Sequence, residues 1–182
     1  MTPSPIALRV AAVVAFAALM ALSAQIAVPM VPVPMTLQSF AVLLAGAVMG
    51  PRWGVASVLL YLAAAMIGLP VLSDAASGIA RFTGPTAGYL AAFIPAAFLA
   101  GWLARNGRLT RLIPATAWMV ALHLLILAWG SAWLALDVGM EPALRNGALP
   151  FIPGAVIKSL LVVLAARALT PALARFVPVR PA

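Results

Sequence analysis

Residues 68–89 read Gly68-Leu-Pro-Val-Leu-Ser-Asp-Ala-Ala-Ser-Gly-Ile-Ala-Arg-Phe-Thr-Gly-Pro-Thr-Ala-Gly-Tyr89. The rest of the chain is mostly apolar. The stretch contains Asp74, one of three acids in the whole chain, together with Arg81, four glycines and two prolines. Such a backbone cannot continue one helix through lipid, and non-helical backbone is tolerated at membrane depth only where protein buries it or where it lines a watery cavity. The stretch therefore predicts a ligand site or its rim. A solvated loop is the alternative, although helix connections usually need only about 2–8 residues.

The bulk composition places the chain in a membrane. The 182 residues are 65% hydrophobic and 8% charged, with a mean hydropathy of +1.15, which is too apolar for a water-soluble domain. Because a spanning helix needs about 20 apolar residues, the sequence predicts an all-α integral membrane protein, a six-transmembrane-helix bundle forming a single domain over residues 1–182. The expected spans are residues 6–28, 36–50, 52–67, 84–104, 113–136 and 151–175.

Composition also excludes several classes of function. The chain has no cysteine, so disulfides and thiolate chemistry are excluded. One histidine and three acids provide no ligand cluster for a metal, and we expect no cofactor. The net charge of +8 does not indicate nucleic-acid binding, because ten of the eleven cations are arginines scattered at predicted helix ends rather than gathered on one face.

The distribution of charge predicts an orientation. With six spans and an inner N-terminus, the outer segments hold Arg81 and Arg145 and all three acids. The inner segments hold eight arginines, which are Arg9, Arg52, Arg105, Arg108, Arg111, Arg167, Arg175 and Arg180. This bias agrees with the positive-inside rule, so we expect a multi-pass protein of the cell (inner) membrane with both termini cytoplasmic. The polar stretch would then lie outside.

The first predicted span carries a stripe of small residues. Ala7, Ala11 and Ala15 recur every four positions, which lets another helix approach closely. The stripe is expected to pack either inside this bundle or against a separate subunit. Another interpretation is a signal peptide, with Arg9 ahead of an apolar run and a cleavage-like site at residues 21–23. The run is long enough to span, however, and the charge bias requires that it be retained.

Three prolines follow within Val28-Pro-Met-Val-Pro-Val-Pro-Met35, which predicts a stiff, extended connection. Thr36 and Gln38 then open the second span near the outer end of the bundle. The amide of Gln38 is a candidate hydrogen-bonding group for a ligand. Helix capping by Thr36 is the other interpretation of this pair.

Lys158 is the only lysine, and it lies about two turns into the apolar sixth span. A charged side chain in such a span costs on the order of 3 kcal/mol or more unless it is paired, faces water or extends to the interface. Either Lys158 reaches the outer interface along its own aliphatic stem, or it awaits an anionic ligand group. The Gly-Lys pair of a phosphate-binding loop is missing, because Ile157 precedes the lysine.

His123 is the only histidine and lies in the middle of the fifth span. Ser131, eight residues on, is about 12 Å away along one helix, too far to pass its proton to the imidazole. The ordinary interpretation is a hydrogen-bonded histidine that packs helices together. An intramembrane hydrolase that uses His123 is the competing hypothesis.

Four motifs in order make the chain resemble the BioY family, the biotin-binding substrate components of energy-coupling-factor transporters. These motifs are Pro34-Met-Thr-Leu-Gln38, Gly68-Leu-Pro-Val71, Gly84-Pro-Thr-Ala-Gly-Tyr-Leu90, and Pro150-Phe-Ile-Pro-Gly154 followed by Lys158. The resemblance covers nearly the whole chain. It implies a six-helix bundle with cytoplasmic termini and a biotin site near the outer face. It also implies a first helix that docks on a transmembrane coupling protein, which works with a pair of ATPases.

The chain departs from the family pattern at two positions. An aspartate often follows the glycine of the last motif, and Ala155 stands there. The central motif often has a second glycine where this chain has Ala87. The first departure leaves one polar contact of the ligand unassigned, and we expect the second to change only local packing.

The residues suit the chemistry of biotin, a small anion with an apolar thioether ring and a ureido group. Lys158 and Arg81 can supply positive charge, and Asp74 or Gln38 can hydrogen-bond the ureido group. Tyr89, with Trp129 or Trp133, can supply an apolar wall. We expect a subunit that captures and carries biotin and catalyses no reaction, with Lys158 on the carboxylate and Asp74 on the ureido nitrogens. A carrier for another small carboxylate vitamin is the alternative.

Overall fold

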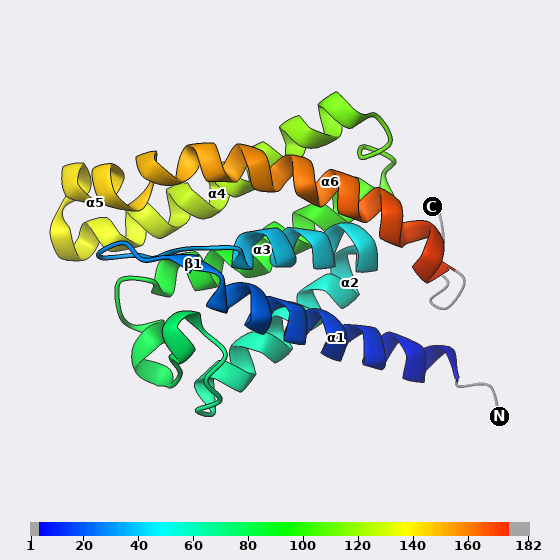
Figure 1. Cartoon of the computed structure of the whole chain (residues 1–182), viewed down its shortest axis with the longest axis horizontal. Helices are drawn as coiled ribbons and strands as arrows, with labels where there is room; N and C mark the ends of the chain where they lie inside the picture. The colour runs from blue at the N-terminus through cyan, green and yellow to red at the C-terminus, as the bar shows by residue number, and fades with distance from the viewer. Residues whose placement is uncertain (1–3, 175–182) are drawn as a thin grey trace.

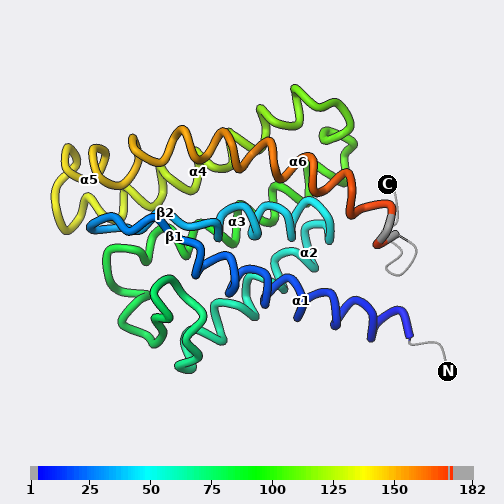
Figure 2. Tube along the Cα trace, in the orientation of Figure 1, coloured from blue at the N-terminus to red at the C-terminus, as the bar shows by residue number. Residues whose placement is uncertain are grey.

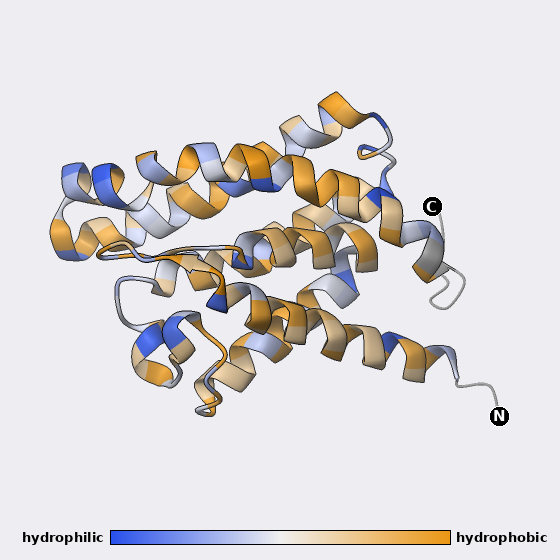
Figure 3. Cartoon of the chain, viewed as in Figure 1, coloured by the Kyte–Doolittle hydropathy of each residue, from blue (hydrophilic) through white to orange (hydrophobic). Residues whose placement is uncertain are grey.

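A computed structural model describes residues 4–174 of the chain. Its long helices are α1 (Pro5–Gln25), α2 (Gln38–Met66), α3 (Ala87–Arg105), α4 (Leu112–Val138) and α6 (Ile152–Ala174), with a short helix α5 (Met140–Gly147) between the last two. Five helical segments of the described chain are long and apolar enough to cross a membrane. The prediction of an all-α, multi-pass membrane protein is confirmed, and Figure 3 shows hydrophobic residues along the long helices and hydrophilic ones on α5.

The helix α2 joins two segments that the sequence placed in separate spans. Gly50 interrupts it with φ 77° and ψ 176°, and Pro51 follows. Figure 2 shows the chain reversing direction within α2, so the two segments run back along each other. They approach so closely that a Cβ on Gly54 would lie 2.6 Å from the Cα of Gly46. The break that the sequence placed between the expected spans 36–50 and 52–67 is therefore present, and glycines on both sides of it allow the close approach.

The first helix is shorter than expected because its end is drawn into a small sheet. Ser4 caps α1 by accepting a hydrogen bond from the amide of Ala7 at 3.2 Å, and the helix ends at Gln25 rather than near residue 28. Strand β1 (Ala27–Val28) then pairs with β2 (Met35–Thr36) in antiparallel register, Ala27 opposite Thr36 and Val28 opposite Met35. The proline-rich connection is extended, as predicted.

The polar stretch folds back onto α1 and α2 and forms no continuous helix. It contains two short 3-10 turns, η1 (Ser73–Ala75) and η2 (Ile79–Phe82). The side chain of Gln25 holds it from α1, donating to the carbonyl of Leu72 at 2.9 Å and accepting from the amide of Ala75 at 3.2 Å. The amide of Gly78 donates to the carbonyl of Ala65 at 2.8 Å, at the end of α2. These bonds satisfy a backbone that has no helical partners.

The two ends of the bundle differ. Figure 1 shows the beginning of α1 and the end of α6 at one end of the molecule. The opposite end carries α5, the strand pair and the polar stretch. The helix α5 was not expected from the sequence, which predicted a loop there. Arg175 and Arg180, used in the charge count, lie outside the described residues.

Candidate functional site

A cavity opens at the end of the bundle that carries the polar stretch. It holds about 660 Å³, counting the part open to solvent, and its walls come from the strand connection, η1, η2, all the long helices except α1, and the 3-10 turn η3 (Leu149–Phe151). Small-molecule sites are mostly apolar with a few placed polar groups, and the lining of this cavity has that composition. The polar lining side chains are Thr36, Gln38, Ser39, Ser73, Arg81, Thr86 and Lys158. Much of the apolar lining comes from Leu72, Tyr89, Leu90, Phe93, Ile126, Leu127 and Phe151.

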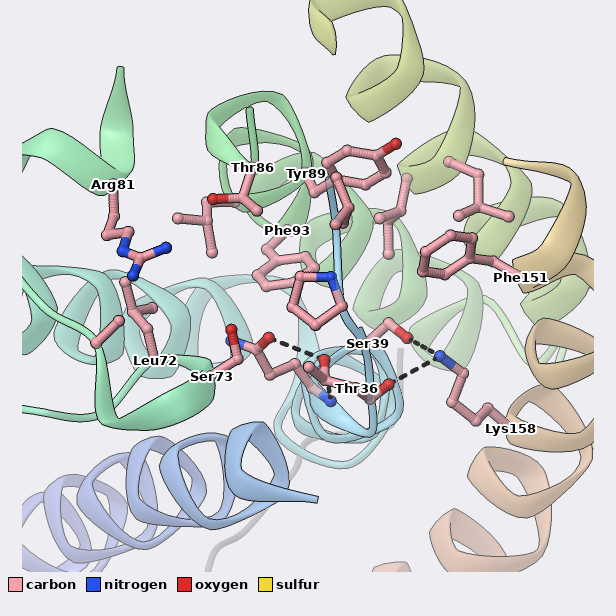
Figure 4. Close-up of a pocket in the computed structure, with 17 residues that line it drawn as sticks. Thr36, Ser39, Leu72, Ser73, Arg81, Thr86, Tyr89, Phe93, Phe151 and Lys158 are labelled. Carbon is pink, nitrogen blue, oxygen red and sulfur yellow. Dashed lines mark hydrogen bonds between the residues drawn. The ribbon is translucent and has the colours of Figure 1, made fainter. Parts of the chain in front are cut away.

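Lys158 reaches into this cavity from α6 and bonds the beginning of α2. Its Nζ donates to the carbonyl of Thr36 at 3.1 Å and to Oγ of Ser39 at 2.8 Å (Figure 4). Both acceptors are neutral oxygens, so the positive charge is hydrogen-bonded by them but not neutralised. An ammonium has three N–H donors, and these two bonds leave the third for a ligand. The half-buried cation therefore favours an anionic group in the cavity.

Gln38 lines the cavity, but most of its amide is used within the protein. Its Nε2 donates to the hydroxyl of Tyr61, and that hydroxyl donates to the carbonyl of Val71 at 3.1 Å. Its Oε1 accepts from the hydroxyl of Thr36 at 2.9 Å. The chain of bonds fixes β2 and the polar stretch to both segments of α2. One N–H of the Gln38 amide remains for a ligand.

Tyr89 forms part of the cavity wall with its ring, while its hydroxyl is used elsewhere. The hydroxyl donates to the carbonyl of Gly147 at 2.8 Å and lies 3.2 Å from Oγ of Ser131. A Cβ on Gly130 or on Gly147 would collide with this tyrosine, so both glycines make room for it. Tyr89 thus joins α3 to α4 and to the end of α5, and contributes an apolar surface to the site.

The tryptophans do not form the wall that the sequence suggested. Neither Trp129 nor Trp133 is among the lining residues, because each lies on a more exposed face of α4. The indole Nε1 of Trp133 instead donates to the carbonyl of Gly84 at 3.1 Å. Trp133 therefore holds the start of the Gly84–Leu90 motif from outside the cavity.

The two charged residues of the polar stretch differ in position. Arg81, on η2, lines the cavity and lies across it from Lys158 in Figure 4. Asp74 is exposed on η1 with φ 58°, and its neighbour Ser73 lines the cavity instead. The structure thus brings Lys158, Arg81, Tyr89 and Gln38 to one cavity and leaves Asp74 outside, because the turn at η1 directs the next residue outward.

Several lining residues escaped the sequence reasoning. Ser39 and Thr86 are small polar residues at helix beginnings, where capping is the usual interpretation. Phe93 and Phe151 lie in apolar runs, where nothing separates a ligand-facing aromatic ring from a lipid-facing one. Three signals were available: Ser39 adjoins Gln38, Thr86 lies within the Gly84–Leu90 motif, and Phe151 lies within the Pro150–Gly154 motif.

His123 contacts a serine, but not the one the sequence singled out. Its Nδ1 lies 2.9 Å from Oγ of Ser159 on α6, whereas Ser131 bonds Tyr89. The Ser159 hydroxyl donates its proton to the carbonyl of Ala155 at 2.7 Å. Its proton is therefore not directed at the imidazole, as a nucleophile activated by a base would require. Neither side chain lines the cavity. The pair does not have the geometry of a nucleophile and its base. Among residues 4–174 no group of three or more His, Asp or Glu could hold a metal ion.

The alanine stripe of α1 faces outward. Ala7, Ala11 and Ala15 are exposed. The opposite side of α1 packs into the core through Val13, Phe16, Ala17 and Met20. Among residues 4–174, therefore, the stripe is exposed and is not buried against another helix.

These features define a class: a multi-pass helical membrane protein with a small-molecule cavity, lined by one half-buried cation, at one end of its bundle. The BioY family profile matches residues 2–175, and the chain belongs to this family. It is 42% identical over 161 residues to a probable biotin transporter BioY of Pyrococcus horikoshii, which covers 88% of this chain and 95% of that protein. It is 38% identical over 146 residues to a biotin transporter BioY of Rhizobium etli, covering 76% of this chain and 78% of that protein.

A solved structure has the same fold. The crystal structure of the S-component for biotin from an ECF-type ABC transporter matches with a TM-score of 0.80 and 29% identity. The match covers 94% of this chain and 95% of that chain. The resemblance stated from the four motifs is confirmed.

Proposed function

We propose that this protein is the substrate-capture component, for biotin, of an energy-coupling-factor transporter, and that it binds and carries its ligand without chemical conversion. The observation that carries the proposal is Lys158, a half-buried cation with neutral acceptors in an apolar-walled cavity. A monocarboxylate with an apolar body complements that site. Membership of the BioY family and the biotin-transporter names of the relatives support biotin as the ligand.

In this proposal the carboxylate of biotin accepts the remaining N–H of Lys158. The thioether ring packs among Tyr89, Phe93 and Phe151. The ureido group then lies toward the other side of the cavity, where Arg81, Ser73 and Thr86 offer polar groups (Figure 4). Asp74 is not given the ureido nitrogens, because it lies outside the lining.

We propose six membrane crossings, with both termini cytoplasmic, in the cell (inner) membrane. The break at Gly50 and the reversal seen in Figure 2 support two crossings by α2. The beginning of α1 and the end of α6 lie at one end of the bundle, as an even number of crossings requires. Arg52 lies just after the break at Gly50, Arg105 ends α3, and Arg108 and Arg111 lie in the α3–α4 connection. The positive-inside rule places these arginines in the cytoplasm. The cavity then faces outward.

The proposed partners are a transmembrane coupling protein and a pair of ATPases. The exposed stripe of Ala7, Ala11 and Ala15 supports α1 as the surface that the coupling protein contacts, since small side chains allow close helix approach in lipid. The solved relative is described as part of an ECF-type ABC transporter, which supports the ATPases. The lipid bilayer surrounds the remaining helix faces.

Equilibrium binding to the purified protein in detergent tests the proposal. Biotin should bind, and biotin amide, which lacks the carboxylate charge, should bind more weakly. Lys158→Ala should weaken biotin binding roughly ten- to a hundredfold, because a charged hydrogen bond contributes about 1.5–3 kcal/mol, and should change amide binding little. An equal loss for both ligands would show that Lys158 is not the carboxylate partner. Tighter binding of another carboxylate vitamin would replace biotin as the ligand.

A further inference from the structure

The buried pair formed by His123 and Ser159 is not explained by ligand contact or by catalysis. His123 is 2% exposed and Ser159 is fully buried, and the two come from different helices, α4 and α6. Ser159 directly follows Lys158 along α6. Successive helical side chains point about 100° apart, so Ser159 faces α4 while Lys158 faces the beginning of α2.

The hydrogen bonds determine which imidazole nitrogen carries the proton. The single hydroxyl proton of Ser159 is donated to the carbonyl of Ala155 at 2.7 Å, so Oγ can only accept from the imidazole. The carbonyl of Met119, 3.1 Å from Nδ1, can only accept as well. Nδ1 is therefore the protonated nitrogen, shared between Met119 and Ser159. The other nitrogen, Nε2, is buried and has no partner among the described residues.

The buried imidazole of His123 is less favourable for packing alone than an apolar side chain would be. A buried polar atom without a partner costs about 1–3 kcal/mol, which a leucine at the same position would avoid. What the imidazole supplies is a donor that joins α4 to the turn of α6 carrying Lys158. That turn is then held from two directions, by His123 on one side and by Thr36 and Ser39 on the other.

We infer that His123 is a positioning residue for Lys158: its Nδ1–H bond to Ser159 fixes the α6 turn so that the ammonium meets the carboxylate of the ligand. The inference rests on the proposed function of Lys158. His123 does not touch the ligand, but through Lys158 it contributes to the preference for biotin over biotin amide. Small displacements matter here, because the hydrogen bond weakens steeply once its geometry departs from the optimum.

The test compares two replacements of the histidine. Asn carries an N–H near the position of Nδ1, whereas Leu carries no donor. In detergent-purified protein, His123→Leu and Ser159→Ala should each weaken biotin about three- to tenfold, the loss expected for one neutral hydrogen bond acting through Lys158, and weaken biotin amide less. His123→Asn should restore most of the preference for the acid. In a Lys158→Ala background, His123→Leu should change biotin binding no further.

Ser57→Ala is the matched control. Ser57 is also fully buried, and its hydroxyl donates to the carbonyl four residues earlier, Trp53, at 3.0 Å, but it lies on α2 outside the cavity lining. It should lower the melting temperature without changing the ratio of the two affinities. Equal weakening of acid and amide by His123→Leu, or no weakening, overturns the inference. If Lys158→Ala itself weakens acid and amide equally, the proposed role of Lys158 fails first, and the two failures are distinguishable.

Discussion

Two small-residue faces of this protein have similar sequences and opposite environments. Between α2 and α3, Gly46 faces the backbone of Ala97 so closely that an added Cβ would collide with its carbonyl oxygen, and Gly101 faces Gly50 and Pro51 in the same way. On α1, the alanine stripe of Ala7, Ala11 and Ala15 is exposed. Small residues at regular helical spacing thus indicate that another helix can approach closely, but they do not indicate which helix it is.

The difference lies in what surrounds each face. Where α2 meets α3 beside Gly46, Ala97 and Ala100 are fully buried. The helix α1 contacts the bundle along one side only, through Phe16 and Met20 among others. A face with backbone contact on this chain is needed for folding, whereas an exposed face of the same composition is free to bind a partner.

The largest expected effect is at the buried face. Gly46→Leu should destabilise the protein by about 3 kcal/mol or more, because four carbons cannot enter a backbone–backbone contact without separating the helices. Thermal unfolding in detergent and the yield of monodisperse protein measure the loss. Ala15→Leu is the matched control on the exposed face and should unfold at the wild-type temperature. Equal melting temperatures for the two variants would erase the distinction between the faces.

A smaller loss of stability is expected at Gly88, where an added methyl group would meet mainly one side chain. Gly88 lies against the Cβ of Trp133 and within 3.1 Å, for an added Cβ, of the carbonyl oxygen of Trp129. Gly88→Ala should cost about 1–3 kcal/mol through overpacking. Gly88→Ala should cost less in a Trp133→Gly background, which lacks the two Trp133 atoms nearest the added methyl, Cβ and Cγ. An equal cost in both backgrounds would mean that the clash is with the backbone alone.

A third glycine separates steric from conformational demands. Gly107, in the α3–α4 connection, has φ 68° and nothing within 4 Å of an added Cβ. Gly107→Ala should therefore lower the free energy of unfolding by about 1 kcal/mol, only because alanine disfavours the left-handed backbone conformation. Gly107→Asn should cost less, because asparagine tolerates this conformation. A chemical or thermal unfolding series would show this order, and a cost above that of Gly88→Ala would contradict it.

The smallest effect on stability is expected at the exposed stripe. Ala11→Trp should change the free energy of unfolding by less than about 0.5 kcal/mol, as expected for a surface site, and leave biotin binding intact. It should nevertheless block assembly with the coupling protein and biotin uptake, because bulk prevents close approach. Co-purification and uptake assays test this together. Loss of folding would mean that the stripe is needed within the chain itself.

The sequence predicted the membrane class, the extended proline connection and the non-helical polar stretch, because each depends on composition or on backbone chemistry local to the chain. It brought forward Lys158, Arg81, Tyr89 and Gln38, all of which line the cavity. It offered Asp74 for the ureido nitrogens, whereas the structure leaves that residue exposed on η1, outside the cavity lining. The positive φ angles of Asp74 and Ala75, which shape this turn, cannot be read from the sequence. It weighed only Ser131 as a partner for His123, because sequence spacing gives a distance only between residues of one helix. The serine that His123 contacts, Ser159, lies on another helix.

What the sequence determined by itself follows from local physics: apolar runs must form helices in lipid, and glycine, proline and scattered charge end them. Only the tertiary structure decided which distant residues meet, such as Lys158 with Ser39, Tyr89 with Gly147, and His123 with Ser159. The physical reason is that helix rotation and crossing are set by interfaces of small residues whose partners the spacing does not name. The exposure of Ala11 and the burial of Gly46 were decided in the same way.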